Sequence, residues 1–315
     1  MEPPSFPAVA SAVIACGSEL GFVPGAGPEA LVRLAGDAGF NGIALGAGCG
    51  LRDVAPLIGA SLAAGLVVSA VAAPLSADPL PAGRRLPYLA AMEDSDERRA
   101  AVAAFKATLE AAGTFGVRLL SVSLGAVSLG VSAQRVARRF ARRELDDDDP
   151  GAASWRAAVG ERRALSGMVV DACRHALDRI LPDAERRDAV IALEVAGDPW
   201  GLPGPREAMI LIDEYRNGPI AAVWDEARMQ VLTTLGIGMS AERAAALAQV
   251  TKLWRANEAV GTEIGYLPGL GDPGAARADT AVIARPQDAP IVITGRQDSR
   301  PREIALARAL VAGRA

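Results

Sequence analysis

Two carboxylates occupy positions in this chain where a charge is costly unless it has a partner. Glu194 lies inside the apolar run VIALEVAG (190–197), and Asp225 ends the apolar run PIAAVWD (219–225), with Glu226 directly after it. A buried carboxylate must be paired with a cation or bound to a metal ion. Both residues are therefore candidates for a general base or a metal ligand, and the structural alternative for Glu194 is a bridge to a neighbouring arginine.

Arginine accompanies these carboxylates where a metal enzyme would call for histidine. Arg228 follows Asp225 by three residues, Arg255 and Asn257 share the run TKLWRANEA, and Arg296 ends the run APIVITGR. A guanidinium group is permanently charged and pairs bidentately with carboxylates or with anionic substrates. These residue types predict an anion-binding site, or a site in which positive side chains stand where a metal ion would be.

An alternation of apolar runs and helical patterns predicts how these side chains are positioned. Eight strand-like runs, each followed by a helical or loop–helix segment, fit a single closed (β/α)₈ TIM barrel of the α/β class. The competing open sheet is disfavoured because no G-x-G-x-x-G loop follows the first run. In TIM barrels the catalytic residues lie at the carboxyl ends of the strands. The fourth run ends near Ser123, which is therefore a further candidate. The predicted strands are 8–15, 42–46, 66–75, 117–125, 188–197, 219–225, 251–259 and 289–296.

Composition limits the kinds of protein that this chain can be. It has 315 residues, 50% of them apolar, which is enough for one large core or for two modest domains, and the barrel interpretation favours a single domain over 1–315. The formal net charge of -4 argues against a nucleic-acid partner. A charged connection at about 131–153 contains RVARRFARR followed by ELDDDDP, and its opposite charges nearly cancel. Three cysteines without close spacing, and no signal peptide, predict a cytoplasmic protein.

One uncharged stretch, 54–77, is long enough to span a membrane. Pro56, Gly59, Gly65 and Pro74 divide it, and β-branched residues crowd into LVVSAV. A helix end, a glycine turn and a buried parallel strand account for this stretch better than a membrane span does.

Several motifs, taken in order, resemble the xylose isomerase-like TIM barrels, which are sugar and sugar-phosphate isomerases and epimerases with endonuclease IV relatives. The resemblance implies a divalent metal at the barrel mouth, held by a Glu, an Asp, a His and a Glu from strands 5 to 8. In the epimerases the two glutamates also transfer the proton. The motifs are LAGDAGFNGIAL, ATLEAAGTFGVRLLSVSLG, LDRILPDAERRDAVIALEV, AAVWDEAR and LPGLGDPG.

Only part of the implied ligand set is present. Glu194 matches the first Glu and Asp225 matches the Asp, but Arg228 takes the place of the His in the family's "D.gH" motif. The strand-7 His falls near Arg255, and the last Glu falls on Thr294.

The strand-7 Asp of the family falls near Asn257 or Glu258, and the single histidine, His175, lies mid-helix. Glu194 and Asp225 with water or Asn257 would make at most a weak Mg²⁺ or Mn²⁺ site, and zinc is disfavoured. We therefore expect either no cofactor or a weakly bound divalent metal.

These residues predict an isomerase/epimerase-like or lyase-like protein that abstracts a proton next to a carbonyl of a small oxygenated, anionic substrate. Glu194 or Asp225 would be the base, and Arg228, Arg255, Asn257 and Arg296 would bind the substrate. The alternative is a catalytically silent barrel that binds a ligand or a partner. We expect no membrane or nucleic-acid partner, and a homo-oligomer is compatible with the sequence.

Overall fold

The structure is a computed structural model of the chain. It describes residues 13–18, 27–78, 87–91, 94–127, 149–197, 200–260, 263–268, 285–295, 299 and 301–312. Arg296 and residues 131–148 of the charged connection lie outside the described residues.

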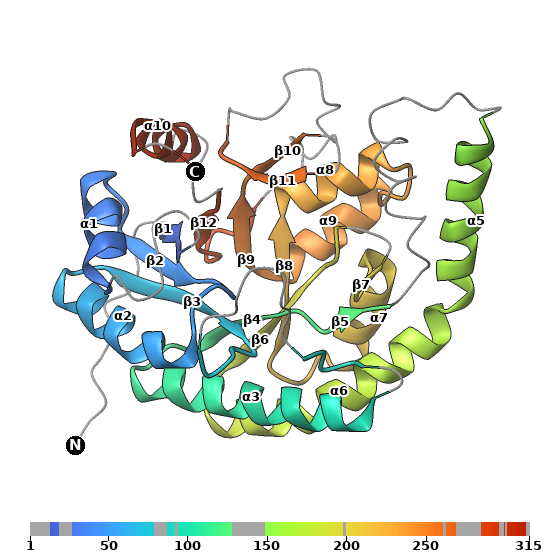
Figure 1. Cartoon of the computed structure of the whole chain (residues 1–315), viewed down its shortest axis with the longest axis horizontal. Coiled ribbons are helices and arrows are strands. Elements are labelled where there is room, and N and C mark those ends of the chain that lie inside the picture. The colour runs from blue at the N-terminus through green and yellow to red at the C-terminus, as the bar shows by residue number, and fades with distance from the viewer. Residues whose placement is uncertain are drawn as a thin grey trace.

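Eight parallel strands close into a barrel, which confirms the predicted (β/α)₈ class (Figure 1). The barrel closes where Ile14 pairs with Ile291, so the first and last strands of the barrel are neighbours. A strand is present within or overlapping each predicted run, although most are shorter than the run, and residues 8–12 of the first run lie outside the described residues. The strands are β1 (Ile14–Gly17), β2 (Gly42–Leu45), β3 (Val67–Ala73), β4 (Leu119–Val122), β6 (Val190–Glu194), β8 (Ile220–Asp225), β9 (Thr251–Ala256) and β12 (Ile291–Ile293).

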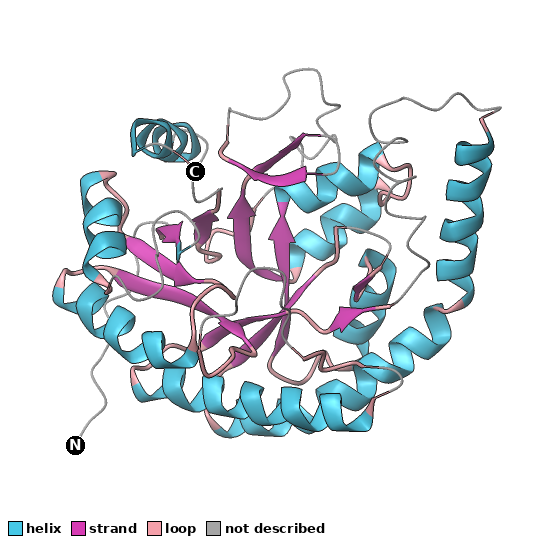
Figure 2. Cartoon of the chain, in the orientation of Figure 1, coloured by secondary structure: helices cyan, strands magenta, loops and turns pink. Residues whose placement is uncertain are grey.

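Helices surround the barrel and cover the outer face of its strands (Figure 2). The uncharged stretch 54–77 forms the end of α2, a turn at Gly65 with φ of +75°, and β3, as predicted. Among the described helices, none is long and apolar enough to cross a membrane. The helices are α1 (Glu29–Asp37), α2 (Leu51–Ala63), α3 (Ser95–Thr114), α5 (Pro150–Ala164), α6 (Ser166–Arg186), α7 (Pro205–Glu214), α8 (Glu226–Thr234), α9 (Ala241–Gln249) and α10 (Pro301–Ala312).

Small side chains fill the inside of the barrel. Seven strands each contribute one residue to an inner layer, and four of the seven are alanines. Because alanine occupies little volume, the layer leaves space above it for longer side chains at the carboxyl ends of the strands. The inner layer is Ala15, Ala44, Ala70, Ala192, Val223, Leu253 and Val292.

Two elements differ from the sequence prediction. The single helix expected over 154–183 is two helices, α5 and α6, separated at Leu165. Ser166 and Gly167 follow this residue, and such pairs favour a bend in a helix. The run TKLWRANEA is not one strand, because β9 ends at Ala256 and β10 (Glu258–Val260) pairs instead with β11 (Glu263–Tyr266).

A second two-stranded pair and one helix were not predicted at all. β5 (Gly125–Ala126) pairs antiparallel with β7 (Gly201–Leu202), next to the carboxyl ends of β4 and β6. Helix α8 begins directly after β8, without an intervening loop, because the Asp225 side chain caps its first turn.

Candidate site at the barrel mouth

The two carboxylates singled out from the sequence end adjacent barrel strands. Glu194 is the last residue of β6, and Asp225 is the last residue of β8. Strands β6 and β8 are paired, so both side chains lie at the same end of the barrel. Glu194 is 8% exposed and Asp225 is 3% exposed, so each needs a partner within the protein.

Arg228 supplies the first partner from the first turn of α8. Its Nη2 donates to Oε2 of Glu194 at 3.0 Å, and its Nε lies 3.5 Å from Oδ2 of Asp225. Its Nη1 donates to the backbone oxygen of Val195 at 3.2 Å. The backbone N–H of Arg228 also donates to Oδ1 of Asp225 at 3.0 Å, so one carboxylate both caps α8 and faces the arginine that α8 carries.

Gly197 allows Arg228 to take this path. A Cβ atom at position 197 would lie 2.6 Å from Cγ and 2.7 Å from Cβ of Arg228. Carbon atoms do not approach so closely, so any larger residue would displace the arginine stem from Glu194. The glycine that ends the run VIALEVAG is therefore part of the site.

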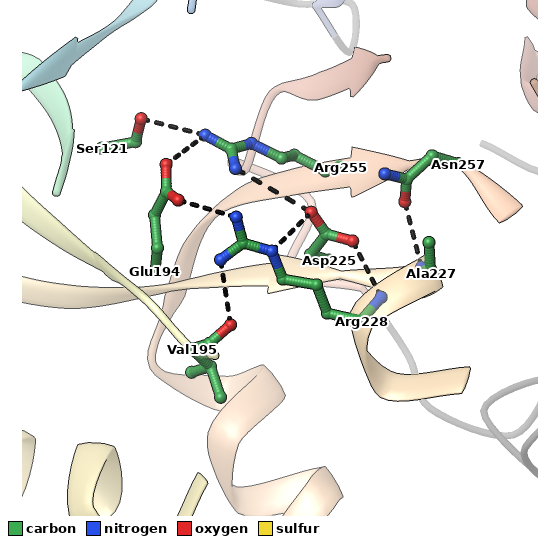
Figure 3. A network of polar contacts seen from close by, with 8 residues as sticks. All are labelled: Ser121, Glu194, Val195, Asp225, Ala227, Arg228, Arg255 and Asn257. Atoms are coloured by element: carbon green, nitrogen blue, oxygen red, sulfur yellow. Dashed lines mark hydrogen bonds and ion pairs between the residues drawn. The ribbon is translucent and has the colours of Figure 1, made fainter. Parts of the chain in front are cut away.

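Arg255 supplies the second partner from β9. Its Nη2 donates to Oε1 of Glu194 at 2.5 Å and to Oγ of Ser121 on β4 at 3.1 Å. Its Nη1 lies 3.8 Å from Oδ2 of Asp225. Positive and negative groups thus alternate around a ring of two carboxylates and two guanidinium groups with no net formal charge (Figure 3). We call Glu194, Arg228, Asp225 and Arg255 the charge ring.

The charge ring changes the acidity of Glu194. Burial by itself would raise the pKa of Glu194, but the positive charges of Arg255 and Arg228 and their hydrogen bonds outweigh burial and lower the pKa to about 2. The side chain is therefore ionised at neutral pH, and both of its oxygens accept hydrogen bonds. A carboxylate stabilised in this way is a weaker base than a free one.

Asn257 has a role inside the fold. Its side-chain oxygen accepts a hydrogen bond from the backbone N–H of Ala227 at 3.0 Å, and the residue is 4% exposed. Asn257 and Asp225 therefore together satisfy two backbone donors at the start of α8. The predicted role of Asn257 towards a substrate stays a prediction.

Sequence reasoning missed three contributors to this site. Ser121 contacts Arg255, whereas Ser123, the residue predicted near the end of β4, is exposed. The Val195 carbonyl and the space at Gly197 are backbone features, which residue types alone do not reveal. Arg296 was predicted to lie at this mouth and falls outside the described residues.

A small cavity lies beside Arg255 at the top of the inner layer. Its volume is about 10 Å³, which is close to the space that one water molecule needs. Arg255, Ser121 and Thr294 are its polar lining, and Ala44, Ala70 and Val292 lie on its apolar side. The lining comes from barrel strands and from Gly46 and Thr294, which directly follow β2 and β12.

The side chains of the described residues do not form a ligand set that fits a divalent ion. Throughout the described ranges, no three His, Cys, Asp or Glu side chains gather in a group that could hold a metal ion. Glu194 and Asp225 face guanidinium groups, so a divalent cation would have to displace or repel positive charges. A weak Mg²⁺ or Mn²⁺ site is therefore not confirmed.

Comparisons with known proteins bear on the fold. No protein-family model matches the chain, and no curated protein matches it significantly by sequence. Solved structures do match over nearly the whole length. An apo 3-keto-D-glucoside 4-epimerase from E. coli superposes with a TM-score of 0.60 at 15% identity, over 97% of this chain and 100% of that chain. This chain has the fold of the xylose isomerase-like TIM barrels.

Two further structures with this fold have informative ligands. A D-allulose 3-epimerase from Methylomonas sp., in complex with D-allulose, matches with a TM-score of 0.62 at 15% identity, over 97% of this chain and 98% of that chain. The IolI protein with a bound zinc atom matches with a TM-score of 0.59 at 12% identity, over 94% of this chain and 95% of that chain. The xylose isomerase-like fold thus includes sugar epimerases and a zinc-binding protein.

Proposed function

We propose that this protein is a sugar isomerase/epimerase-like barrel that works without a tightly held divalent metal and binds a small oxygenated, anionic molecule at the barrel mouth. The observation that carries the proposal is the charge ring, in which Arg228 and Arg255 neutralise Glu194 and Asp225. Two guanidinium groups supply the positive charge that a metal ion would otherwise provide.

Arg255 is the group through which an anion would bind. It lines the mouth cavity together with Ser121, and its side chain is 15% exposed. A carboxylate or phosphate oxygen that accepts from Arg255 would compete with Oε1 of Glu194 for the same Nη2 donor. The substrate anion would thereby take over one of the two cationic partners of Glu194.

Competition for Arg255 links binding to chemistry. In the ring Glu194 is a poor base, because Arg255 and Arg228 hold its pKa at about 2. When an anion occupies Arg255, Glu194 loses one stabilising partner and its pKa rises, which makes it a better proton acceptor. Glu194 then abstracts a proton next to the substrate carbonyl, and the hydroxyl of Ser121 donates to the resulting oxyanion.

A catalytically silent binding protein is the second candidate. The low pKa of Glu194 and the small size of the cavity beside Arg255 favour it. In this case the anion binds to Arg255, but Glu194 stays paired with Arg228 and takes no proton.

Solvent deuterium exchange separates the two candidates. D-fructose 6-phosphate and D-fructose form a matched pair of anionic and neutral ketoses, and each is incubated with the protein in D₂O with EDTA. We expect deuterium to enter the position next to the carbonyl in the phosphate ester only. Glu194→Gln should lower the rate by about a hundredfold or more, the range for loss of a general base.

Glu226→Gln is the matched control, because Glu226 adjoins Asp225 but accepts from Nε1 of Trp254 at 3.0 Å and is not part of the charge ring. Binding without exchange would support the silent protein. Exchange that requires added Mn²⁺, or that persists in Glu194→Gln, would contradict the metal-free mechanism. Absence of both binding and exchange over a panel of sugar phosphates and sugar acids would overturn the proposal.

A further inference from the structure

A large groove lies among the helices outside the barrel strands, and none of the four charge-ring residues lines it. Its volume is about 730 Å³, which is within the usual range for small-molecule pockets. The lining residues come from α5, the start of α6, α7, the end of α8, the segment that leads into α9 and the first turn of α9. Figure 1 shows where these helices lie around the barrel. The mouth cavity shares no lining residue with it.

A buried ion pair forms a rigid part of the groove wall. Nη1 and Nη2 of Arg162 donate to the two carboxylate oxygens of Glu207 at 2.7 and 2.6 Å, and the Arg162 residue is 8% exposed. Ser166 and the backbone N–H of Gly204 also donate to this carboxylate, at 3.0 and 2.8 Å. Both carboxylate oxygens of Glu207 therefore have hydrogen-bond partners. Through these contacts the carboxylate joins α5 and α6 to the first turn of α7.

Three further arginines give the groove its charge. Arg163, Arg206 and Arg243 line it and have exposed side chains. Within the part of the chain that the structure describes, no ion pair joins any of the three to an acidic residue. Because Glu207 is the acidic lining residue and is neutralised by Arg162, the groove has an excess of positive charge. An anionic group is the complement of such a lining.

The rest of the lining is apolar. These side chains come from α5, α7, α8 and the segment before α9, so they form one continuous wall beside the arginines. Ile210 is 38% exposed, so part of this apolar side chain is open to solvent beside the arginines. The apolar lining residues are Val159, Met209, Ile210, Leu232, Ile237 and Met239.

We propose that this groove binds an amphipathic organic anion, with an acidic head group on an apolar chain of medium length. The head group lies among Arg163, Arg206 and Arg243, and the chain lies along Ile210 and its apolar neighbours. The neutral Arg162–Glu207 pair keeps the groove open, because it fixes α5 against α7. This site is independent of the reaction at the barrel mouth.

Decanoate tests the proposal, with 1-decanol and decyltrimethylammonium as probes of equal chain length and different charge. Binding is followed below micellar concentrations by titration calorimetry and by tryptophan fluorescence, since Trp155 and Trp200 belong to the cluster that contains Val159 and Ile237. We expect saturable binding of decanoate that weakens as salt is added, and weaker binding of the other two probes. Arg163→Glu with Arg206→Glu should weaken decanoate binding about tenfold.

Matched variants keep the result interpretable. Arg216→Glu reverses an exposed charge just beyond α7, outside the groove lining, and should change the affinity less than about twofold. Ile210→Asp should abolish binding, whereas Met168→Asp, at another exposed apolar residue outside the lining, should not. The proposal is overturned if decanoate does not bind saturably, if the cationic probe binds as tightly, or if the control variants weaken binding as much.

Glu194→Gln distinguishes this groove from the barrel mouth. Because Glu194 is not a lining residue of the groove, its substitution should leave decanoate affinity unchanged. Tighter decanoate binding in Glu194→Gln would place the ligand at the mouth, because Arg255 would lose the carboxylate that competes for its Nη2 donor, and would also overturn the proposal.

Discussion

At the residue scale, Glu194 shows how two arginines keep a buried carboxylate ionised. Two guanidinium groups contact its two oxygens, at 2.5 Å from Arg255 and 3.0 Å from Arg228. Replacing one partner of such a group is costly, because the remaining charges stay buried and unpaired. The same contacts that stabilise the protein also reduce the basicity of Glu194 in the free protein.

Acid should unfold the protein in part through Glu194. Its folded pKa, about 2, lies below its ordinary value of 4.5. A depressed pKa gives stability that is fully present above pH 4.5 and is lost as the pH falls through the folded value. The shift corresponds to roughly 3 kcal/mol. Urea unfolding at pH 7 and at pH 3 should show a smaller pH dependence in Glu194→Gln than in the wild type.

Gly197→Ala tests the path of Arg228. The added Cβ would lie within 3 Å of three atoms of this arginine, one of them in the backbone, so Arg228 must move away from Glu194. We expect a loss of about 1–3 kcal/mol in the free energy of unfolding. Gly160→Ala on α5, where nothing lies within 4 Å of the added atom, should be neutral or stabilising. Equal losses in the two variants would contradict this role for Gly197.

At the element scale, α8 is the part of the fold that builds the site. It starts without a loop after β8, and its first turn is held by Asp225 and Asn257 while it carries Arg228 into the ring. The position of this helix therefore sets the position of one of the two cations that face Glu194.

Asn257→Ala should loosen the start of α8. The variant leaves the backbone N–H of Ala227 buried without its acceptor, which costs about 1–2 kcal/mol. Urea unfolding measures the loss. Ser240→Ala is the control, because it removes an exposed cap of α9 with a longer contact of 3.4 Å and should cost less. A larger loss in Ser240→Ala than in Asn257→Ala would show that the Asn257 contact contributes little.

At the scale of the whole molecule, the barrel brings four distant segments to one point. Ser121, Glu194, Asp225 and Arg255 lie on β4, β6, β8 and β9, which are consecutive in the barrel. Closure of the barrel holds these strand ends together, so the charge ring depends on the intact fold. The cytoplasmic location, the oligomeric state and the single-domain division stay predictions.

The thermal stability of the molecule should not depend on divalent metal. A ligand that binds only the folded state raises the melting temperature, and the described donor set does not fit such an ion. We expect the same melting temperature with EDTA as with Mn²⁺, and metal analysis of the purified protein should find less than one equivalent. A stoichiometric, tightly held ion would contradict the replacement of the metal by arginines.

The sequence by itself determined the architecture and the two carboxylates of the site. Alternating apolar runs and helices predict the barrel, because strand and helix periods are local properties of the chain. Glu194 and Asp225 could be found because a charge in an apolar strand needs a partner. Arg228 and Arg255 could be predicted as site residues from their positions near the ends of the predicted strands. Their contacts could not be predicted in this way.

Only the tertiary structure decided which charges pair. A ring that joins β6, β8, β9 and α8 depends on strand register and on helix placement, and Asp225 itself sets the latter by capping α8. The space at Gly197, the contact from Ser121 and the groove around Arg206 come from residues far apart in sequence. The type of a residue does not encode such contacts, because they arise when separate elements pack against each other.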